Sequence, residues 1–332
     1  MLLDAAKRRR PSPGESLHGV AATFLDELGL DRGFLEQTAR RSYLAEIAWE
    51  SAELRERRAI DHAWGPDCHV DRDAFDAWLT GEAERGGAER MGCVAFERAV
   101  FDHALARFRC SVRCESASIT ISCGALVDGT GRSAVVMRQL TGRAATGSDT
   151  LIAASRSYSE PLARPSVLIE ATDDGWWYSA PQPGNRSVAI WFTDAAVARG
   201  RAAQPEGFDA ALHASVHTRA RVAGLKSDSA PSVCAAGPSR SMFDVGLPAL
   251  PVGDAAAAFD PISGDGLCFA LRSALEAAET LVRLRAGDRH ALAAYAAGVE
   301  AVYVRHVTRR AQLYDAVVRF GDAPFWKRRQ HD

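Results

Sequence analysis

The residues between positions 252 and 274 offer the clearest chemistry in the sequence. They follow a short apolar run and lie directly before a long helical pattern. Glycines in such a turn let backbone N–H groups and the positive end of a helix approach an anionic or electron-accepting ligand. A carboxylate there could also hydrogen-bond ligand hydroxyls, whereas the alternative is a plain glycine-rich connection between a strand and a helix. The residues concerned are Gly253, Asp254, Pro261, Gly264 and Gly266.

The sequence predicts several helices that would hold this segment in place. Residues 17–40 hold apolar side chains at helical spacing ahead of Gly29, which predicts a helix followed by a turn. A second amphipathic helix is expected to begin after Asp71, whose carboxylate can cap it. Long helices are also expected after residue 266 and across 290–320.

Strand patterns occupy the middle of the chain. Between residues 92 and 130, short apolar stretches with a period of two predict a meander of strands. Further strands are expected in SVLIEAT, GWWYSAPQ and SVAIWFTDA, with a hairpin turn at Pro183-Gly184-Asn185. Together these segments predict an antiparallel sheet in an α/β protein.

Composition excludes several classes of protein. The chain has 332 residues, 47% of them hydrophobic, and a formal net charge of −2. Such a chain can bury a core, and it has no general attraction for nucleic acid or an anionic membrane. Its seven cysteines show no CxxC pair and no zinc spacing, so reduced thiols and no metal site are expected. The leucines of MLLDAAKRRR precede the basic run, the reverse of a signal peptide, and a cytoplasmic protein is expected.

The run VGDAAAAFDPISGDGLCFAL (252–271) resembles a motif of a known family. It is similar to the flavin-contacting GD motif and following loop of FAD-dependent monooxygenases and flavin-dependent halogenases, which share a p-hydroxybenzoate hydroxylase-like fold. The resemblance implies that Asp254, with Gly253, binds the ribityl and phosphate region of FAD. It also implies that Pro261, Gly264 and Gly266 line the isoalloxazine ring, with the following helix aimed at its N1–C2 carbonyl region.

Three other segments resemble the same family in the same order. LVDGTGRSA (126–134) is similar to its second dinucleotide motif, CHVDRDAFDAWL (68–79) to a helix that faces the cofactor, and PSPGESLHG (11–19) to a segment beside the flavin. Taken alone, Arg72 would be an ordinary solvated helix residue and Glu15 an ordinary carboxylate at the start of a helix. By resemblance, the cofactor-binding residues implied are Asp128, Gly129, Arg132, Arg72, Gly14, Glu15 and Ser16.

The resemblance also implies the fold and the domain organisation. The fold class expected is α/β, with a Rossmann-like, N-terminally truncated FAD-binding domain, an antiparallel β-sheet substrate domain and a C-terminal helical segment. The FAD-binding domain is expected to be discontinuous, over 1–141 and 235–290. The substrate domain is expected over 142–234 and the helical segment over 291–332.

The start of the chain departs from the family pattern. Relatives begin with a strand, a GxGxxG turn and a helix, and then a second strand that ends in an acidic residue for the adenosine ribose. Here MLLD matches that second strand, with Asp4 as the ribose acid, and no GxGxxG precedes it. Either the start codon is mis-assigned or the product is damaged; the first is favoured, because a sheet without its middle strand would expose unpaired edges. The basic run 7–10 is either a contact to the diphosphate or a solvated turn.

The family resemblance implies one of two oxidative reactions. In the family, reduced FAD reacts with oxygen to give a C4a-hydroperoxide, which oxygenates an electron-rich aromatic ring or oxidises halide for transfer through a lysine. The chain has lysines only at 7, 226 and 327, none at the family's interval after PGES. WWYSAP (176–181) also departs from the halogenase WxWxIP signature. A monooxygenase that hydroxylates a phenol- or indole-type ring, small or peptide-bound, is therefore favoured over a halogenase.

Several residues could form the substrate site. Trp176 and Trp177 could wall a substrate pocket, although aromatic residues on a strand more often only pack the sheet. One of His18, His62 and His69 could act as a base, with a non-catalytic polar histidine as the alternative. The catalytic residue itself is left unassigned.

Two further questions stay open from the sequence. No second nucleotide fold is expected, so reducing equivalents would come from transiently docked NAD(P)H or a separate flavin reductase. A non-catalytic remnant that has lost FAD and acts as a binding protein is the alternative from another class. The missing GxGxxG supports that alternative, whereas the GD and DGTGRS segments argue against it.

Overall fold

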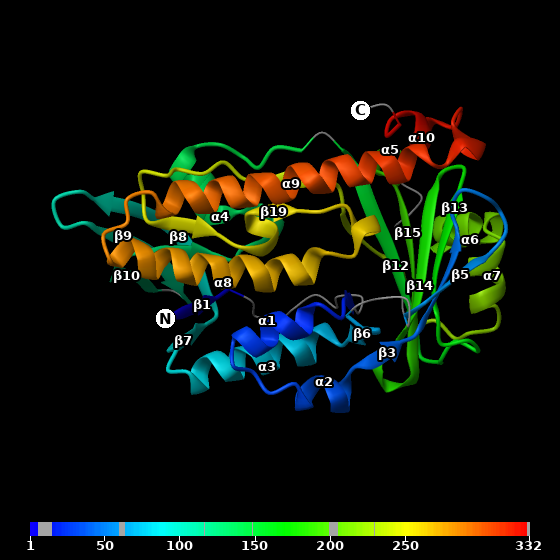
Figure 1. Ribbon diagram of the computed structural model, residues 1–332, viewed down its shortest axis with the longest axis horizontal. Helices are drawn as coiled ribbons and strands as arrows, with labels where there is room; N and C mark the ends of the chain where they lie inside the picture. Colours follow the sequence, from blue (N-terminus) through cyan, green and yellow to red (C-terminus); the bar gives the residue numbers. More distant parts are fainter. Residues whose placement is uncertain are drawn as a thin grey trace.

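The computed structural model describes residues 1–5, 15–59, 64–115, 117–147, 149–198, 205–228 and 230–330. Gly14, His62 and the basic run 7–10 lie outside the described residues. Figure 1 shows a large sheet at one end of the molecule and two long helices that run along the length of the molecule. A layer of shorter elements comes from the first part of the chain.

The largest sheet has seven strands and confirms the predicted strands at 167–194. Their order is β16 (Ser232–Ala235), β12 (Leu151–Tyr158), β15 (Arg186–Asp194), β14 (Gly175–Gln182), β13 (Val167–Thr172), β4 (Leu44–Ala48) and β5 (Arg55–Arg58). A 3-10 turn at Pro183–Asn185 joins β14 to β15, as the hairpin prediction requires.

One pair of neighbouring strands in this sheet is parallel. β4 pairs with β13 in parallel, whereas all other neighbours are antiparallel. The antiparallel pairing predicted for the strands between 166 and 195 is confirmed, and β4, which comes from a distant segment that was not predicted as a strand, joins them in parallel. The predicted domain boundaries stay a prediction.

Both faces of the large sheet are covered. On one face, Trp177 and Trp191 pack against Phe208, in a cluster that also holds Val222. The helices there are α5 (Ala195–Ala198), α6 (Pro205–Ala214) and α7 (His217–Val222). On the other face, the cluster around Trp176 includes residues from the end of α9 (Ala291–Asp315) and from α10 (Pro324–Lys327).

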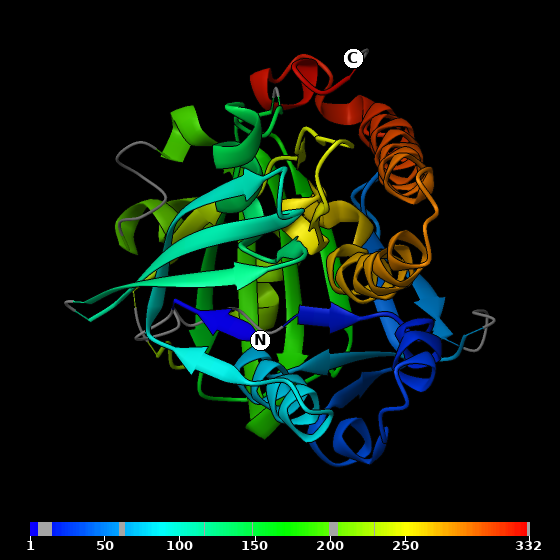
Figure 2. The same ribbon diagram turned by 90° about the vertical axis from the view of Figure 1, so that its left-hand side faces the viewer.

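A second region carries the glycine-rich segments. The predicted meander is confirmed as β8 (Val94–Asp102), β9 (Arg107–Cys114) and β10 (Ala117–Cys123), followed by β11 (Leu126–Asp128). β11 pairs in parallel with β18 (Ala249–Pro251), as β1 (Leu2–Asp4) does with β7 (Arg90–Gly92). The remaining elements are α4 (Val135–Thr141), β17 (Ser239–Arg240), β19 (Ala257–Ala258) and α8 (Gly266–Arg285). Figure 2 shows the meander in front of the large sheet, with α8 and α9 together at one side.

The third region comes from the first part of the chain. Strands β2 (Glu15–Leu17), β6 (Asp67–Val70) and β3 (Arg40–Ser42) form an antiparallel sheet beside α1 (Ala21–Glu27), α2 (Gly33–Thr38) and α3 (Arg72–Arg85). The predicted helix signals are confirmed. Asp71 accepts a hydrogen bond from the Ala74 N–H at 3.0 Å, and Gly29 adopts φ +69° just after α1. Leu17 and Leu25 pack this layer against Leu267 of α8.

The observed mixture of sheets and helices confirms the predicted α/β class. Among the helices in the described part of the chain, none combines the length and apolar character needed to cross a membrane.

Candidate active site

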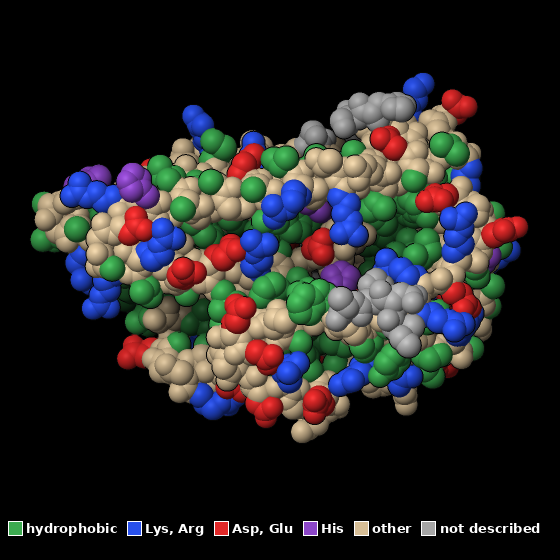
Figure 3. Space-filling view, viewed as in Figure 1, with side chains coloured by type: hydrophobic (Ala, Val, Ile, Leu, Met, Phe, Trp, Pro, Cys, Tyr) green, Lys and Arg blue, Asp and Glu red, His purple; other side chains and the backbone are tan. Residues whose placement is uncertain are grey.

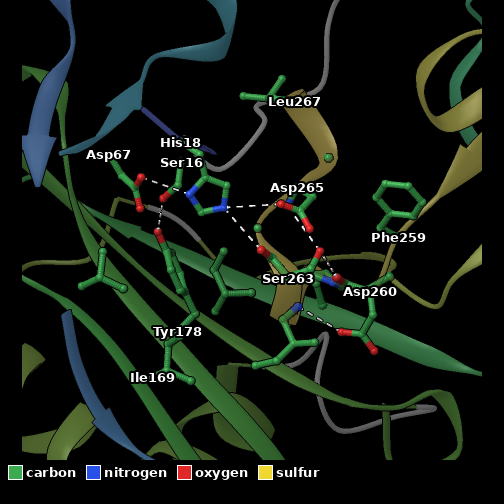
Figure 4. A pocket seen from close by; sticks show the side chains of 18 of the residues that line it. Ser16, His18, Asp67, Ile169, Tyr178, Phe259, Asp260, Ser263, Asp265 and Leu267 are labelled. Carbon is green, nitrogen blue, oxygen red and sulfur yellow. Dashed lines mark hydrogen bonds and ion pairs between the residues drawn. The ribbon is translucent and has the colours of Figure 1, made fainter. Parts of the chain in front are cut away.

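A cavity of about 710 Å³ lies between the large sheet and the loop that leads into α8. Figure 4 shows it from close by, with side chains from the first layer, from the sheet and from this loop pointing into it. Figure 3 shows a hollow on the surface with apolar side chains inside and charged ones around it. The cavity has a charged end, at Arg72, Arg132 and Asp254, and a largely apolar end against the sheet.

The turn after β18 places Asp254 at the charged end. Gly253 adopts φ +54°, and a Cβ there would lie 3.3 Å from the Ala270 Cβ, so the left-handed turn and the close helix both favour glycine. The Gly253 N–H donates to Ser273 Oγ at 2.9 Å, which fixes the turn on α8. The carboxylate of the next residue is thereby directed to the cavity wall.

Two arginines lie near this carboxylate. Arg132 Nε is 3.5 Å from Asp254 Oδ2, while its Nη2 donates to the carbonyls of Ala236 and Phe259 at 3.3 Å each. Partial burial raises the pKa of Asp254, and the positive charges of Arg132 and Arg72 act against that rise. The result is a fixed cluster of one carboxylate and two guanidinium groups suited to hydroxyls and phosphates.

Three glycines leave open space in the cavity wall. A Cβ built at Gly131 or Gly266 would meet no described atom within 4 Å, and one at Gly129 would meet only Val252 Cγ2, at 4.0 Å. Gly131 also has φ +65°, but Gly129 and Gly266 have no such backbone requirement. Because the protein does not fill this space, the bare backbone suits a flat ligand that lies against it.

The loop before α8 is held in place by the buried Asp260. Asp260 is completely buried and accepts hydrogen bonds from Ile262 N–H at 3.0 Å and from Arg310 Nε at 2.8 Å. These contacts hold the turn that begins at Pro261. Gly264 then adopts φ +69°, and a Cβ there would lie 2.6 Å from His18 Nε2. The structure therefore brings Pro261, Gly264 and the start of α8 together in one wall.

His18 bridges the first layer and this loop. Its Nδ1 is 3.1 Å from Asp67 Oδ1, and its Nε2 lies 3.3 Å from the Ser263 carbonyl and 3.9 Å from Asp265 Oδ1 (Figure 4). The hydrogen bond to Asp67 raises the pKa of His18, although burial acts in the opposite direction. His18 therefore carries positive charge more readily than a solvated histidine.

A series of hydrogen-bonded side chains reaches the cavity at Tyr178. Its Oη lies 2.7 Å from Ser16 Oγ, which is in turn 3.0 Å from Nδ1 of the completely buried His69. Burial lowers the pKa of His69 to about 4, which keeps the ring neutral. In the sequence, Tyr178 stands out only as part of the WWYSAP run that departs from the halogenase signature. Its position two residues after Trp176 on a strand was the signal that both share a face.

The predicted pair Trp176 and Trp177 does not wall one pocket. Trp176 lines the cavity and stacks on Phe192 with ring centroids 3.9 Å apart. Trp177 lies on the opposite face of the sheet, stacked on Trp191. Successive side chains of a strand point to opposite faces, so the prediction that Trp177 contributes to the substrate pocket is wrong.

Two predicted cofactor-binding carboxylates lie away from the described cavity lining. Asp128 is buried and accepts hydrogen bonds from the Thr130 and Met137 N–H groups at 3.0 and 2.9 Å, so it holds its own turn instead of facing a diphosphate. Asp4 ends β1 and pairs with Arg90 Nη2 at 2.9 Å. Glu15 belongs to β2, but its side chain lies outside the described part, as does Gly14. Ser16 and Arg72 do line the cavity.

Known proteins share both sequence and fold with the chain. No protein-family model matches it. LodB of Marinomonas mediterranea, which is named a putative FAD-dependent oxidoreductase, is 25% identical over 336 residues, which cover 99% of this chain and 89% of LodB.

The solved structures extend the comparison. The flavin-dependent halogenase CmlS has a TM-score of 0.88 at 19% identity and covers 99% of this chain, which spans 62% of CmlS. The peptidyl tryptophan dihydroxylase QhpG has a TM-score of 0.73 at 21% identity, over 97% of this chain and 71% of QhpG. PqsL of Pseudomonas aeruginosa, a probable FAD-dependent monooxygenase, has a TM-score of 0.74 at 19% identity, over 97% of this chain and 91% of PqsL. The resemblance predicted from the motifs is confirmed: the chain is similar in sequence to LodB, and its fold is similar to those of flavin-dependent halogenases and FAD-dependent monooxygenases.

Proposed function

We propose that the protein is a monooxygenase that hydroxylates an electron-rich aromatic ring of phenol or indole type. The observation that carries this proposal is the shape of one continuous cavity. It joins the Arg132–Asp254 cluster beside the start of α8 to an aromatic wall that contains Trp176 and Tyr178. Bound FAD, once reduced, would supply the activation of dioxygen that such a reaction needs.

The charged end of the cavity fits the cofactor. Asp254 would hold hydroxyls of the ribityl chain, while Arg132 and Arg72 would neutralise phosphate charge. Gly129 and Gly266 leave the backbone bare where a flat ring system would lie. The first N–H groups of α8 favour negative charge near Gly266, as a reduced flavin would present.

The apolar end fits an aromatic substrate. Trp176, Phe192 and Ile169 give a wall that excludes water and packs against a ring. The hydroxyl of Tyr178 is the polar group on this wall, and its bond to Ser16 fixes its direction. A substrate O–H or N–H would hydrogen-bond to this oxygen and set which ring atom faces the cofactor.

The residues of the cavity favour hydroxylation over halogenation. None of the described residues that line it is a lysine, the side chain through which halogenases pass their oxidant. Lys226 and Lys327 are exposed on the surface, and Lys7 lies outside the described residues. Halogenation is the second candidate, because the fold is similar to that of the halogenase CmlS. The open cavity also favours an enzyme over a non-catalytic remnant.

The substrate ring is either free or peptide-bound. The name of QhpG states that it acts on peptidyl tryptophan, which supports a peptide-bound ring as one proposed substrate form. The reductant is proposed to be NAD(P)H or a separate flavin reductase.

One experiment tests both the cofactor and the reaction. The purified chain is titrated with FAD, then supplied with reduced FAD, isotopically labelled dioxygen, bromide and a panel of phenols, indoles and tryptophan-containing peptides. We expect a flavin absorbance that remains after desalting, and a product that gains one labelled oxygen atom by mass spectrometry. A brominated product, or a protein that binds no FAD, would overturn the proposal.

A further inference from the structure

Two cysteines outside the cavity lie side by side in the meander. Cys110 on β9 pairs in register with Ile121, and Cys123 on β10 pairs with Phe108, so the two cysteines are diagonal neighbours on one face. Their sulfur atoms are 3.9 Å apart. We propose that Cys110 and Cys123 form a redox-active dithiol that hydroperoxides convert to a reversible disulfide.

The two thiols differ in accessibility. Cys110 is 2% exposed and packs with Phe108 and Met137, whereas Cys123 is half-buried at the last residue of β10. A reagent from solvent therefore reaches Cys123 first. Cys110 is placed to attack the product of that first reaction.

The surroundings of Cys123 favour its thiolate. The Cys110 thiol hydrogen-bonds to it and lowers its pKa; burial opposes this, and the positive charges of Arg107 and of the N-terminus support it. Arg107 is held in place because its guanidinium donates to Ser122 Oγ at 3.0 Å and to the Ser122 carbonyl at 3.3 Å. Reactive cysteines are found in such positively charged, partly exposed surroundings.

Two cysteines elsewhere in the chain provide the contrast. Burial raises the pKa of Cys68 and of Cys268 to about 11, so both stay protonated at neutral pH. A thiol is a far weaker nucleophile than a thiolate. Oxidation at low peroxide is therefore expected to select the pair in the meander over Cys68 and Cys268.

The chemistry balances with a hydroperoxide as the oxidant. The Cys123 thiolate attacks one peroxide oxygen, the O–O bond breaks, and an alcohol or water leaves after taking a proton. The sulfur of Cys110 then attacks the sulfenic sulfur of Cys123, the S–O bond breaks, and water leaves with the thiol proton. Two thiols are oxidised by two electrons and the peroxide is reduced. The sulfurs approach from 3.9 Å to a bond of about 2.05 Å.

The test uses the full chain, reduced with dithiothreitol and freed of it, then titrated with hydrogen peroxide at neutral pH. Remaining thiols are alkylated, the protein is digested without reduction, and peptides are identified by mass spectrometry. We expect a cross-linked species that joins Cys110 to Cys123 and is lost on reduction, while Cys68 and Cys268 are recovered alkylated. Full alkylation of Cys110 and Cys123 while other thiols are oxidised would overturn the proposal.

Variants separate the two roles and control for folding. Cys110→Ser should stop at a sulfenic acid on Cys123 that dimedone traps, and Cys123→Ser should abolish the fast reaction. Cys93→Ser, at an exposed cysteine, should leave the cross-link unchanged. Arg107→Gln keeps both thiols and should slow alkylation of Cys123 at neutral pH, with its pH profile shifted upward. A Cys123→Ser protein that reacts as fast as the parent, or an unshifted profile in Arg107→Gln, would contradict the assignment.

Discussion

Ser16 Oγ and Tyr178 Oη lie 2.7 Å apart, although 162 positions separate them in the chain. The contact joins the first layer to the large sheet inside the cavity. Because Ser16 also contacts the buried His69, at 3.0 Å, the hydroxyl of Tyr178 has a fixed direction before any substrate binds.

The substitution Tyr178→Phe removes this hydroxyl and keeps the ring. The loss of one hydrogen bond to the substrate, about 1 kcal/mol, should lower kcat/KM by about fivefold for a substrate with an O–H or N–H group. FAD affinity should not change. Steady-state kinetics with the substrate found in the panel measure the effect. Tyr158→Phe is the matched control, because Tyr158 packs with Trp177 on the opposite face; equal losses in both variants would refute a role for the Tyr178 hydroxyl.

The substitution Asp254→Asn tests the charged end of the cavity. Hydrogen bonds from ligand hydroxyls to a charged carboxylate are worth about 1.5–3 kcal/mol, and removing the charge weakens them, so FAD affinity should fall by about tenfold. Flavin fluorescence titration measures it. Asp4→Asn changes a carboxylate that pairs with Arg90 away from the described cavity lining and should have a smaller effect. A larger loss for Asp4→Asn would instead support Asp4 as the residue that holds the ribose.

The pH dependence of stability should differ between two histidines. The pKa of His18 is raised, chiefly by its hydrogen bond to Asp67, and Asp265 and the Ser263 carbonyl also face the ring. A group whose pKa is higher in the folded state contributes fully below its unfolded pKa of about 6.5 and loses the contribution as pH rises through the folded value. His18→Gln should therefore lower the free energy of unfolding more at about pH 5.5 than at about pH 8.5.

His69 should give the opposite pH dependence of the free energy of unfolding, which is measured for both variants by denaturation. Burial lowers its pKa to about 4, so the unfolded chain binds the proton first as pH falls. The parent protein should lose stability from His69 as pH falls below about 6.5, and His69→Gln should remove that loss. Identical pH dependence for the two variants would contradict the environments described for them.

The glycines of the cavity wall separate folding from cofactor binding. Gly266→Ala adds a Cβ that meets no described atom within 4 Å, at a helical position where alanine is favoured, so Tm should hold or rise. FAD affinity should fall by about tenfold, because the methyl group occupies space left for the ligand. Gly264→Ala should instead destabilise the fold by about 1–2 kcal/mol, because φ is +69° and His18 lies 2.6 Å from the new Cβ. Thermal melts without FAD and fluorescence titrations compare them, and unchanged FAD affinity in Gly266→Ala would refute the fit.

Local signals in the sequence determined much of this protein. Asp71 caps the start of one helix through a short-range hydrogen bond, and Gly29 ends another because glycine readily adopts a positive φ. Pro183-Gly184-Asn185 specified a hairpin. The glycine and aspartate spacing around Asp254 was enough to predict a turn ahead of a long helix. These features depend on residues within a few positions of one another, so the order of amino acids contains them.

Only the tertiary structure decided which side chains meet in the cavity. The faces of Trp176 and Trp177 depend on how the large sheet is covered on each side, and the parallel addition of β4 depends on a strand more than a hundred residues away in the chain. The contacts among Ser16, His69 and Tyr178 are likewise long-range. Such contacts form only when burial of apolar surface brings distant segments together. A local sequence pattern therefore does not show which distant segment a residue will contact.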